Sequence, residues 1–316
     1  MRIPVCFSCD NKYVPHLGVS ITSILKNKNE DDNLVFYVLD GGISKENKEK
    51  LLSLKSIANF EIKFVKVDNS RFSEIRVYGK DHITDASYYR LILPDICNRE
   101  DKIIYLDCDL VVRTSLYEMM EIDLKNYYVG AVLDSDYIEQ EKRLNLKQYI
   151  NSGVLLLNVL AWHRDNITAK LFDWAKNNKK MILYHDQDII NGALEKSIKI
   201  IDSTWNTQIS KIEKRCNNFD KILSDAKIIH YVAYKPWNAH LRFISMEWLY
   251  FKYLAFTPWK NLKYKFKLKN KYATFRFFIK WLACIRNISK EYKVIQIFGK
   301  SVIKFRRKNR YTIKRD

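Results

Sequence analysis

Two carboxylates one residue apart are the first place in this sequence where chemistry can be expected. Asp107 and Asp109 directly follow the apolar run Lys102–Leu106, and a second apolar run begins at Leu110. Side chains two positions apart on an extended chain point the same way, so both carboxylates can reach one cation. Carboxylate oxygens suit Mg²⁺ or Mn²⁺, which also bind the phosphate oxygens of a substrate. The pattern predicts a metal site for a phosphorylated ligand, and the alternative is a surface turn between two strands.

A histidine and a lysine far along the chain could join this site. The segment Lys227–Tyr234 predicts a short strand that carries His230, and Lys235 follows it. A histidine nitrogen beside two carboxylates shifts the preferred ion from Mg²⁺ toward Mn²⁺. The lysine would supply a point charge for a phosphate group. The alternative for His230 is a purely structural role in the core.

The segments that must position these residues alternate between strand and helix patterns. Short apolar runs predict strands at Ile3–Ser8, Leu34–Leu39, Phe60–Val67, Lys102–Leu106, Val129–Leu133 and Gly153–Asn158. Helical spacing predicts helices at Leu17–Leu25, Ser44–Leu54 and Tyr88–Leu93. This alternation predicts an α/β fold, a Rossmann-like domain with a mostly parallel central sheet. Ligands bind beyond the carboxyl ends of such strands, which is where Ser8–Asp10 and Asp107–Asp109 fall.

Composition and cysteine usage describe a globular protein of a reducing compartment. The chain has 316 residues, of which 47% are hydrophobic, and this is enough to bury a sizeable core. Its six cysteines show no repeated spacing, and the pair Cys6 and Cys9 lies in a predicted buried strand, so we expect reduced thiols. The N-terminus has no apolar run typical of a secretory signal, and no segment reaches the roughly 18 apolar residues of a spanning helix. We therefore expect a cytoplasmic protein.

The net charge of +19 is concentrated at the C-terminal end. Residues 1–250 hold 35 Lys and Arg against 34 Asp and Glu, whereas residues 251–316 hold 20 against two. Fifteen of those last 66 residues are aromatic, and Phe275–Ile288 has apolar residues at helical spacing. We expect a catalytic domain at 1–245 and a basic, aromatic, mainly helical region at 246–316, which lies on an anionic membrane surface.

Two other interpretations of the C-terminal region stay open. It could be an ordinary helical subdomain with solvated charges, or it could bind single-stranded nucleic acid through its basic and aromatic side chains. We expect no nucleic acid, because the rest of the chain contains no RNA-binding fold.

Six segments in order resemble the family-8 glycosyltransferases. They are VCFSCDNKYVPHLGVSITSIL, ASYYRLILP, KIIYLDCDLVV, INSGVLLLN, HDQDIIN and HYVAYKPW, and together they span roughly residues 3–240. The family contains retaining nucleotide-sugar enzymes, among them bacterial lipopolysaccharide galactosyl- and glucosyltransferases and the glycogenins. The resemblance implies a GT-A type domain, a UDP-sugar donor, Mn²⁺ or Mg²⁺ as cofactor, and a glycan or glycolipid acceptor at the inner face of the cell membrane.

The resemblance also implies roles for the residues that would hold the nucleotide. Ser8, Asp10 and Tyr13 would line the uridine site, with Tyr13 stacked on the base. Arg90 would contact the phosphate or the sugar of the donor. Cys108, which lies between the two aspartates, is also expected among these nucleotide-binding residues.

The metal and diphosphate would have their own set of residues. Asp107 would touch the sugar and ribose as well as the ion, and Asp109 would bind the ion with both carboxylate oxygens. His230 would complete the metal shell, and Lys235 would bind the diphosphate. A divalent ion would stabilise the negative charge of the leaving diphosphate.

The remaining candidates would hold or act on the donor sugar. The resemblance places Asn151 and Asp186 on the sugar, Asp134 near its pocket, and Gln187 under the anomeric carbon on the face away from UDP. An amide is a poor nucleophile, so front-face attack by the acceptor hydroxyl is favoured, and Asp186 as a nucleophile is the alternative. Asp186 could also simply cap the helix that follows it.

The sequence departs from the family pattern at two places. Ala233 stands where the family has glycine, and the spacing from His230 to Lys235 is one residue shorter, so we expect the loop to follow another path. Lys12 stands where asparagine is common near the nucleotide, and it could reach the ligand or face solvent. These departures keep a second hypothesis open, a nucleotide-sugar-binding protein that has lost catalysis.

Overall fold

The computed structural model describes residues 1–75, 85–209, 219–238 and 246–263, together with the backbone of three strands between 283 and 306. The described chain divides into two compact units. The first comprises Met1–Pro236 and Ile244–Asn261, and the second comprises Trp237–Phe243 and Leu262–Asp316.

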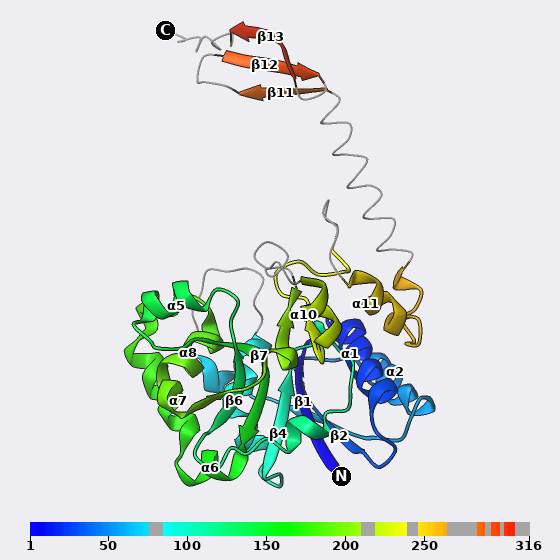
Figure 1. Cartoon of the computed structure of the whole chain (residues 1–316), viewed down its shortest axis with the longest axis vertical. Helices are drawn as coiled ribbons and strands as arrows, with labels where there is room; N and C mark the ends of the chain where they lie inside the picture. Colours follow the sequence, from blue (N-terminus) through cyan, green and yellow to red (C-terminus); the bar gives the residue numbers. More distant parts are fainter. Residues whose placement is uncertain are drawn as a thin grey trace, which may run out of the picture. The chain divides into compact units, whose positions relative to one another are not determined.

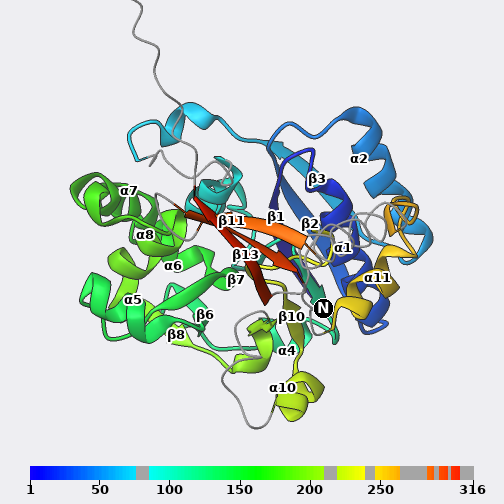
Figure 2. The ribbon, with the colours of Figure 1, turned by 90° about the horizontal axis from the view of Figure 1, so that it is seen from above.

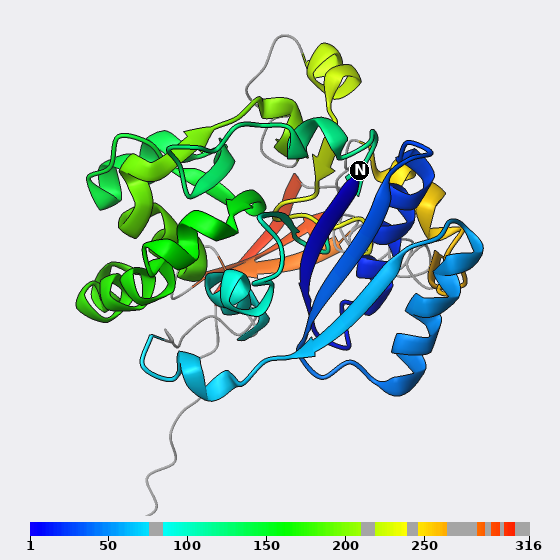
Figure 3. The ribbon, with the colours of Figure 1, turned by 90° about the horizontal axis from the view of Figure 1, so that it is seen from below.

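A seven-stranded sheet with the order β3-β2-β1-β4-β7-β6-β8 forms the centre of the first unit (Figure 1). Its strands are β1 (Arg2–Cys9), β2 (Asn33–Asp40), β3 (Glu61–Lys66), β4 (Lys102–Leu106), β6 (Val129–Leu133), β7 (Ile150–Asn158) and β8 (Ile198–Ile200). The neighbours β1, β2 and β3, shown in blue shades in Figure 3, are parallel, as are β1 with β4 and β6 with β8. Only β7 among these strands runs antiparallel to its neighbours. The predicted mostly parallel sheet is therefore confirmed.

Helices cover the sheet and bury its apolar runs. The helices of the first unit are α1 (Val14–Asn27), α2 (Lys45–Leu52), α3 (Leu93–Ile96), α4 (Tyr117–Met120), α5 (Tyr137–Leu144), α6 (Val159–Arg164), α7 (Ile167–Asn177), α8 (His185–Leu194), α10 (Phe219–Asp225) and α11 (Glu247–Leu254). One core cluster joins the sheet to apolar residues of α3, α6, α7 and α8. Ser44 caps α2, because its side chain accepts the backbone N–H of Asn47.

Short 3₁₀ helices link several of these elements. They span Ser53–Ser56, Asn69–Phe72, Asp85–Ile92, Lys179–Met181, Glu195–Ser197 and Ser203–Asn206. The predicted helix Tyr88–Leu93 is part of the third of these, and Pro94 lies in the first turn of α3 instead of after a helix end. Proline is tolerated there because the first turn of a helix needs no backbone donor at that position.

A second, small sheet brings distant residues to the edge of the first. Its strands are β5 (Leu110–Val112), β10 (Ile228–His230) and β9 (Thr207–Gln208), in the order β5-β10-β9. The strand predicted over Lys227–Tyr234 is limited to β10. Because β10 runs antiparallel to β5, His230 pairs with Leu110.

Helix α11 belongs to the first compact unit, beyond the boundary that the sequence predicts between residues 245 and 246. In Figure 2, α11 and α1 lie side by side, and Nδ1 of His16 is 2.7 Å from the hydroxyl oxygen of Tyr250. Trp259 packs so closely on Gly18 that a Cβ added there would lie 2.5 Å from its ring. A side chain at position 18 would therefore displace the tryptophan.

The described part of the second unit contains a three-stranded antiparallel sheet. Its strands are β11 (Ala283–Asn287), β12 (Tyr292–Ile297) and β13 (Lys300–Arg306). The predicted helix Phe275–Ile288 is wrong over β11, and its other residues lie outside the described part. The described part of residues 246–316 contains helix α11 and these three strands. The segments YKVIQI and KSVIKFR, which form β12 and β13, contain β-branched residues that favour strands. In the described residues, no helix is long and apolar enough to cross a membrane.

Candidate active site

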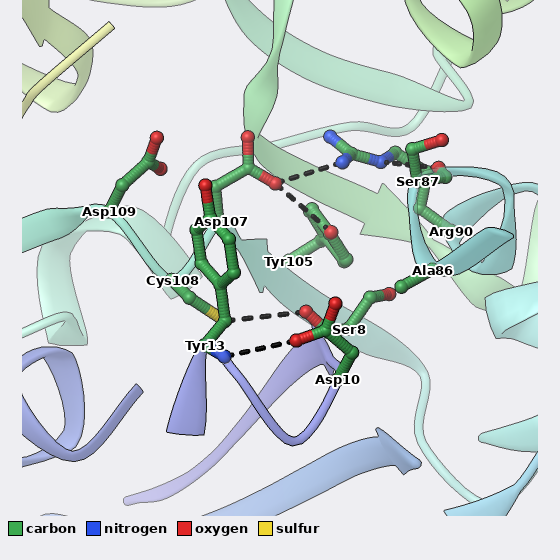
Figure 4. Close-up of a pocket in the computed structure, with 10 residues that line it drawn as sticks. All are labelled: Ser8, Asp10, Tyr13, Ala86, Ser87, Arg90, Tyr105, Asp107, Cys108 and Asp109. Carbon is green, nitrogen blue, oxygen red and sulfur yellow. Dashed lines mark hydrogen bonds and ion pairs between the residues drawn. The ribbon is translucent and has the colours of Figure 1, made fainter. Parts of the chain in front are cut away.

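A cavity of about 250 Å³ opens at the carboxyl ends of β1 and β4 (Figure 4). Its lining residues are Ser8, Asp10, Tyr13, Ala86, Ser87, Arg90, Tyr105, Asp107, Cys108 and Asp109. The cavity thus lies where the strand-end rule predicts a ligand site.

The entrance of α1 forms one wall of the cavity. Oδ1 of Asp10 accepts the backbone N–H groups of Lys12 and Tyr13, at 2.9 and 3.0 Å, and so fixes the turn between β1 and α1. Tyr13 is 39% exposed and lines the cavity. Burial, followed by the nearby Asp109 carboxylate, raises the pKa of the Tyr13 phenol to about 12.

Helix α1 also holds the turn that carries the two aspartates. The Ser20 hydroxyl lies 3.0 Å from the carbonyl oxygen of Cys108 and 2.8 Å from that of Leu110. The Cys108 thiol donates to the carbonyl of Ser8 at 3.3 Å. These contacts tie the end of β1, helix α1 and the turn after β4 together, and the carboxylates of Asp107 and Asp109 rise from this turn on the same side (Figure 4).

Asp107, Asp109 and His230 form a group whose ligand atoms all lie within 4.8 Å of one another. Nε2 of His230 is 3.2 Å from Oδ1 of Asp109 and 3.9 Å from Oδ2 of Asp107. The pairing of β10 with β5 causes this approach, and the Tyr231 N–H donates to the Asp109 carbonyl at 3.0 Å. Two carboxylates and an imidazole are a donor set that fits Mn²⁺ or Mg²⁺.

A lysine faces this group from the loop after β10. The ammonium of Lys235 contacts Oδ2 of Asp109 and donates to the Tyr231 carbonyl at 2.7 Å. Burial alone would raise the pKa of Asp109, but Lys235 and then His230 hold that pKa far below its usual value. Asp109 is therefore ionised over the whole physiological pH range.

The loop between His230 and Lys235 keeps a conformation that glycine favours. Ala233 has φ +59°, in the left-handed region. Alanine therefore occupies a backbone conformation that favours glycine, and the different loop path stays a prediction. Alanine adopts the conformation at a cost in strain, which is about 1–2 kcal/mol for an L-residue in this region.

Arg90 connects the aspartate turn to helix α8. Its guanidinium is 2.9 Å from Oδ1 of Asp107 and 3.1 Å from Oδ2 of Asp186, and it lies over the Tyr105 ring. Burial raises the pKa of Asp186 to about 6, although Arg90 opposes that shift. The hydroxyl of Ser152 also donates to Asp186 at 2.9 Å.

Asp186 does not cap helix α8, contrary to one reading of the sequence. The helix begins at His185, so Asp186 lies inside its first turn. Oδ2 of Asp188 accepts the backbone N–H groups of Leu183 and Tyr184, at 2.7 and 2.8 Å. The carboxylate of Asp186 faces Arg90.

A set of hydrogen-bonded amides forms the other side of the site. Oδ2 of Asp134 accepts from Nδ2 of Asn151 at 3.0 Å and from Nε2 of Gln187 at 3.3 Å. Nδ2 of Asn206 donates to Oδ1 of Asn151 at 2.9 Å. We call Asp134, Asn151, Gln187 and Asn206 the amide side, and Arg90, Asp107, Asp109, His230 and Lys235 the charged side.

The profile of the family described as "Glycosyl transferase family 8" matches residues 4–240. The chain belongs to glycosyltransferase family 8. It is 29% identical over 278 residues to General stress protein A of Bacillus subtilis (strain 168), covering 83% of this chain and 96% of that protein. It is also 29% identical over 282 residues to a lipopolysaccharide 1,2-glucosyltransferase of Escherichia coli, covering 84% and 81% of the two chains.

A solved structure shows the same fold. The galactosyltransferase LgtC, crystallised in complex with donor and acceptor sugar analogues, matches with a TM-score of 0.71 and 25% identity, over 81% of this chain and 96% of that one. The expected GT-A type α/β fold is therefore confirmed, and the chain is a glycosyltransferase.

In this family-8 glycosyltransferase the predicted site residues are brought together in two groups. Ser8, Asp10, Tyr13, Arg90, Asp107, Cys108 and Asp109 line the cavity. His230 and Lys235 contact Asp109. Asp186 contacts Arg90 and Ser152, and Gln187 accepts the Ser152 N–H. Both Asn151 and Gln187 donate to Asp134. Lys12 is exposed and shares only its backbone N–H with this wall.

Sequence reasoning missed several residues of the glycosyltransferase site. Ala86, Ser87 and Tyr105 line the cavity although no role was predicted for them. Each lies within one of the recognised segments, ASYYRLILP or KIIYLDCDLVV. Their position in these motifs could therefore have indicated a role in the site. Asn206 lies outside all six segments and was not indicated by any pattern.

Proposed function

We propose that this glycosyltransferase moves a hexose, galactose or glucose, from a UDP-sugar to a glycan acceptor and retains the anomeric configuration. The observation that carries the proposal is the convergence of Asp107, Asp109 and His230 within 4.8 Å beside a cavity that Tyr13 also lines. A divalent cation between these groups and a flat base on Tyr13 would hold the two ends of a nucleoside diphosphate.

Mn²⁺ or Mg²⁺ is the proposed cofactor, held by Asp107, Asp109 and His230. When bound, such an ion supplies Lewis-acid stabilisation of the departing diphosphate. Lys235 lies on the same carboxylate as the ion would, so its ammonium is placed to neutralise phosphate charge. Arg90 contributes a second cation at the Asp107 end of the cavity.

Front-face attack is the proposed route to retention. The amide of Gln187 is engaged on both sides, since its oxygen accepts the Ser152 N–H at 3.1 Å and its nitrogen donates to Asp134. Asp186, the alternative nucleophile, is already paired with Arg90 and hydrogen-bonded by Ser152. These contacts reduce the nucleophilicity of the carboxylate and favour its role in holding the sugar.

Lipopolysaccharide, lipooligosaccharide or another cell-surface glycan is the proposed acceptor. Relatives of the chain include lipopolysaccharide 1,2-glucosyltransferase and 1,3-galactosyltransferase, the latter from Salmonella typhimurium. The charge distribution supports the same proposal, because the excess of 18 positive charges beyond residue 250 would favour an anionic membrane surface. A location at the inner face of the cell membrane follows from it.

Release of UDP tests the transferase proposal. We expect turnover with UDP-galactose or UDP-glucose in the presence of Mn²⁺, with UDP-N-acetyl sugars as comparison donors. Asp109→Ala should lower turnover by about 10²–10³-fold, the usual effect of losing an electrostatic group at such a centre. Asp31→Ala, at an exposed position far along the chain from the site, is the matched control.

The alternative is a nucleotide-sugar-binding protein without catalysis. Binding of UDP without turnover of any donor, measured by calorimetry and UDP release together, would support it against the transferase. Flotation with anionic and neutral liposomes tests the membrane proposal. The full chain should float with anionic vesicles and a chain ending at Asn261 should not, and equal flotation of both would contradict a role for the C-terminal region.

A further inference from the structure

Asn206 stands between the two sides of the site. It is the last residue of the 3₁₀ helix Ser203–Asn206, directly before β9, and only 2% of it is exposed. Nδ2 of Asn206 lies 2.9 Å from Oδ1 of Asn151, and Oδ1 of Asn206 lies 3.0 Å from Nδ1 of His230. One buried side chain thus joins the amide side to the charged side.

Two neighbouring groups determine which end of the Asn151 side-chain amide is the oxygen and which is the nitrogen. The backbone N–H of Gly153 can only donate, and it lies 3.0 Å from one end of the Asn151 amide, so that end is the oxygen. The carboxylate of Asp134 accepts at the other end, 3.0 Å away, so that end is the nitrogen. Both observations give the same orientation.

The orientation of Asn151 determines the orientation of the Asn206 amide and then the protonated nitrogen of His230. Because Oδ1 of Asn151 is an acceptor, the atom of Asn206 that faces it must be the NH₂ group. The other end of Asn206 is then its oxygen, which can only accept. The nitrogen of His230 opposite that oxygen must therefore carry a hydrogen.

The hydrogen on Nδ1 leaves Nε2 as the nitrogen with a lone pair in the neutral ring. Nε2 is the atom that faces Asp109 and Asp107. We infer that Asn206 is a positioning residue, which holds His230 in the Nδ1–H tautomer with Nε2 toward the cation site and is itself oriented by Asn151 on the sugar side. Partners of this kind hold the rings of metal-binding histidines in place.

The inference rests on the proposed function for its metal, but the tautomer can be measured without one. The metal-free full-length chain, labelled with ¹⁵N-histidine, is studied at mildly alkaline pH by long-range ¹H–¹⁵N correlation. His230→Gln assigns the His230 signals among the six histidines. We expect a hydrogen on Nδ1 in the wild type, and a ring that carries its hydrogen on Nε2 alone would overturn the inference.

Two substitutions at position 206 separate its contacts. Asn206→Leu removes both, so we expect a mixture of tautomers and Mn²⁺ affinity about 10–100-fold lower, the usual effect of losing such a partner. Asn206→Asp keeps an acceptor for Nδ1–H but sets a carboxylate against the oxygen of Asn151. It should retain the tautomer and Mn²⁺ affinity while turnover falls.

The control is Asn158→Leu, which removes hydrogen bonds to Leu124 and Ala161 at the other end of β7. It should lower the melting temperature and leave Mn²⁺ affinity unchanged. Wild-type tautomer and Mn²⁺ affinity in Asn206→Leu would overturn the inference. A third result is that the wild type shows Nδ1–H, the leucine variant loses it, and neither protein binds Mn²⁺. In that case the positioning role of Asn206 is supported and the proposed metal is contradicted. If the leucine variant does not fold, the wild-type tautomer and the aspartate variant still decide.

Discussion

The two sides of the site are built from different kinds of contact. The charged side consists of ion pairs, such as Arg90 with Asp107 and Lys235 with Asp109. The amide side consists of neutral donors around one carboxylate, Asp134, which receives both Asn151 and Gln187. A charged ligand can exchange partners with an ion pair, whereas a set of mutually oriented amides keeps one shape.

This difference suggests how the work of a glycosyltransferase is divided. A diphosphate carries charge that must be admitted and released, so we expect the charged side to govern binding and departure of the nucleotide. A hexose is neutral and differs from its epimers by single hydroxyl groups, so we expect the amide side to govern orientation and choice of sugar. Two substitutions test this division, and two more test the stability of the groups around it; they follow from the largest expected effect to the smallest.

Gly153→Ala should disturb both sides at once. A Cβ at this position would lie 2.3 Å from Cε1 of His230, 2.7 Å from Oδ2 of Asp107 and 3.1 Å from Oδ1 of Asn151. We expect weaker Mn²⁺ binding together with a loss in turnover of about 10²-fold or more, since displacements near 1 Å have such effects. Calorimetry and UDP release measure the two quantities.

The control for this substitution is Gly130→Ala in the neighbouring strand β6. There the added Cβ would meet side-chain atoms of Leu124 and Ile201 at 3.2 and 3.3 Å, and these can yield. Near-normal kinetics in Gly153→Ala would show that the two sides are not packed against one another.

Tyr13→Ala should affect the nucleotide end alone. Stacking on a base is worth about 1–3 kcal/mol, so KM for the UDP-sugar should rise roughly 10-fold or more. We expect kcat to change little, because the residues that face the sugar are untouched. Tyr13→Phe keeps the ring and should keep KM. A fall in kcat at constant KM, in steady-state kinetics, would contradict a simple stacking role.

Asp186→Asn should remove a pH dependence of stability. The buried carboxyl has a pKa of about 6, against roughly 3.9 for an unfolded aspartate. Between these values the folded chain keeps its proton while the unfolded chain releases it, so stability falls as pH rises through this window. Relative to the asparagine variant, the metal-free wild type should lose melting temperature from about pH 4 to pH 6. Parallel curves for the two proteins would contradict the raised pKa.

Ala233→Gly should give the smallest effect, and it should be stabilising. Ala233 has φ +59°, and glycine relieves the strain while it increases the entropy of the unfolded chain. We expect a net gain of up to about 1 kcal/mol in the free energy of unfolding, measured by urea denaturation. A lower midpoint with an unchanged slope would show that the alanine is not strained.

Much of the sheet could be predicted from sequence because its strands are continuous apolar runs. Ile104 and Tyr105 of β4, for example, are buried on both faces of the sheet, as is typical of parallel strands between helix layers. A continuous apolar run does not indicate whether a strand is parallel or antiparallel to its neighbour. Nothing in INSGVLLLN therefore indicates that β7 runs antiparallel to β4. Periodicity also failed over Ala283–Asn287 in the second unit, which forms strand β11 and pairs with β12. The spacing of apolar residues within one segment does not show such a pairing partner.

Site residues could be predicted where they stand in a motif or at a strand end. Asp107 and Asp109 satisfy both conditions. Asn206 satisfies neither, because its partners Asn151 and His230 are 55 and 24 residues away and the polar run around it is typical of a turn. A contact made only by tertiary structure leaves no local pattern.

The reversed direction of β7 has a consequence for how donor preference could change. Strand β7 enters the sheet at the edge that carries the cavity, since Gly153 near its beginning accepts the Asp107 N–H at 2.8 Å. The connection from Leu133 to Ile150 therefore starts and finishes beside Asp134 and Asn151, the residues proposed to face the sugar. Insertions and deletions in that connection would reshape the rim of the pocket without passing through the core, so this segment is where diversification among relatives is expected to be tolerated.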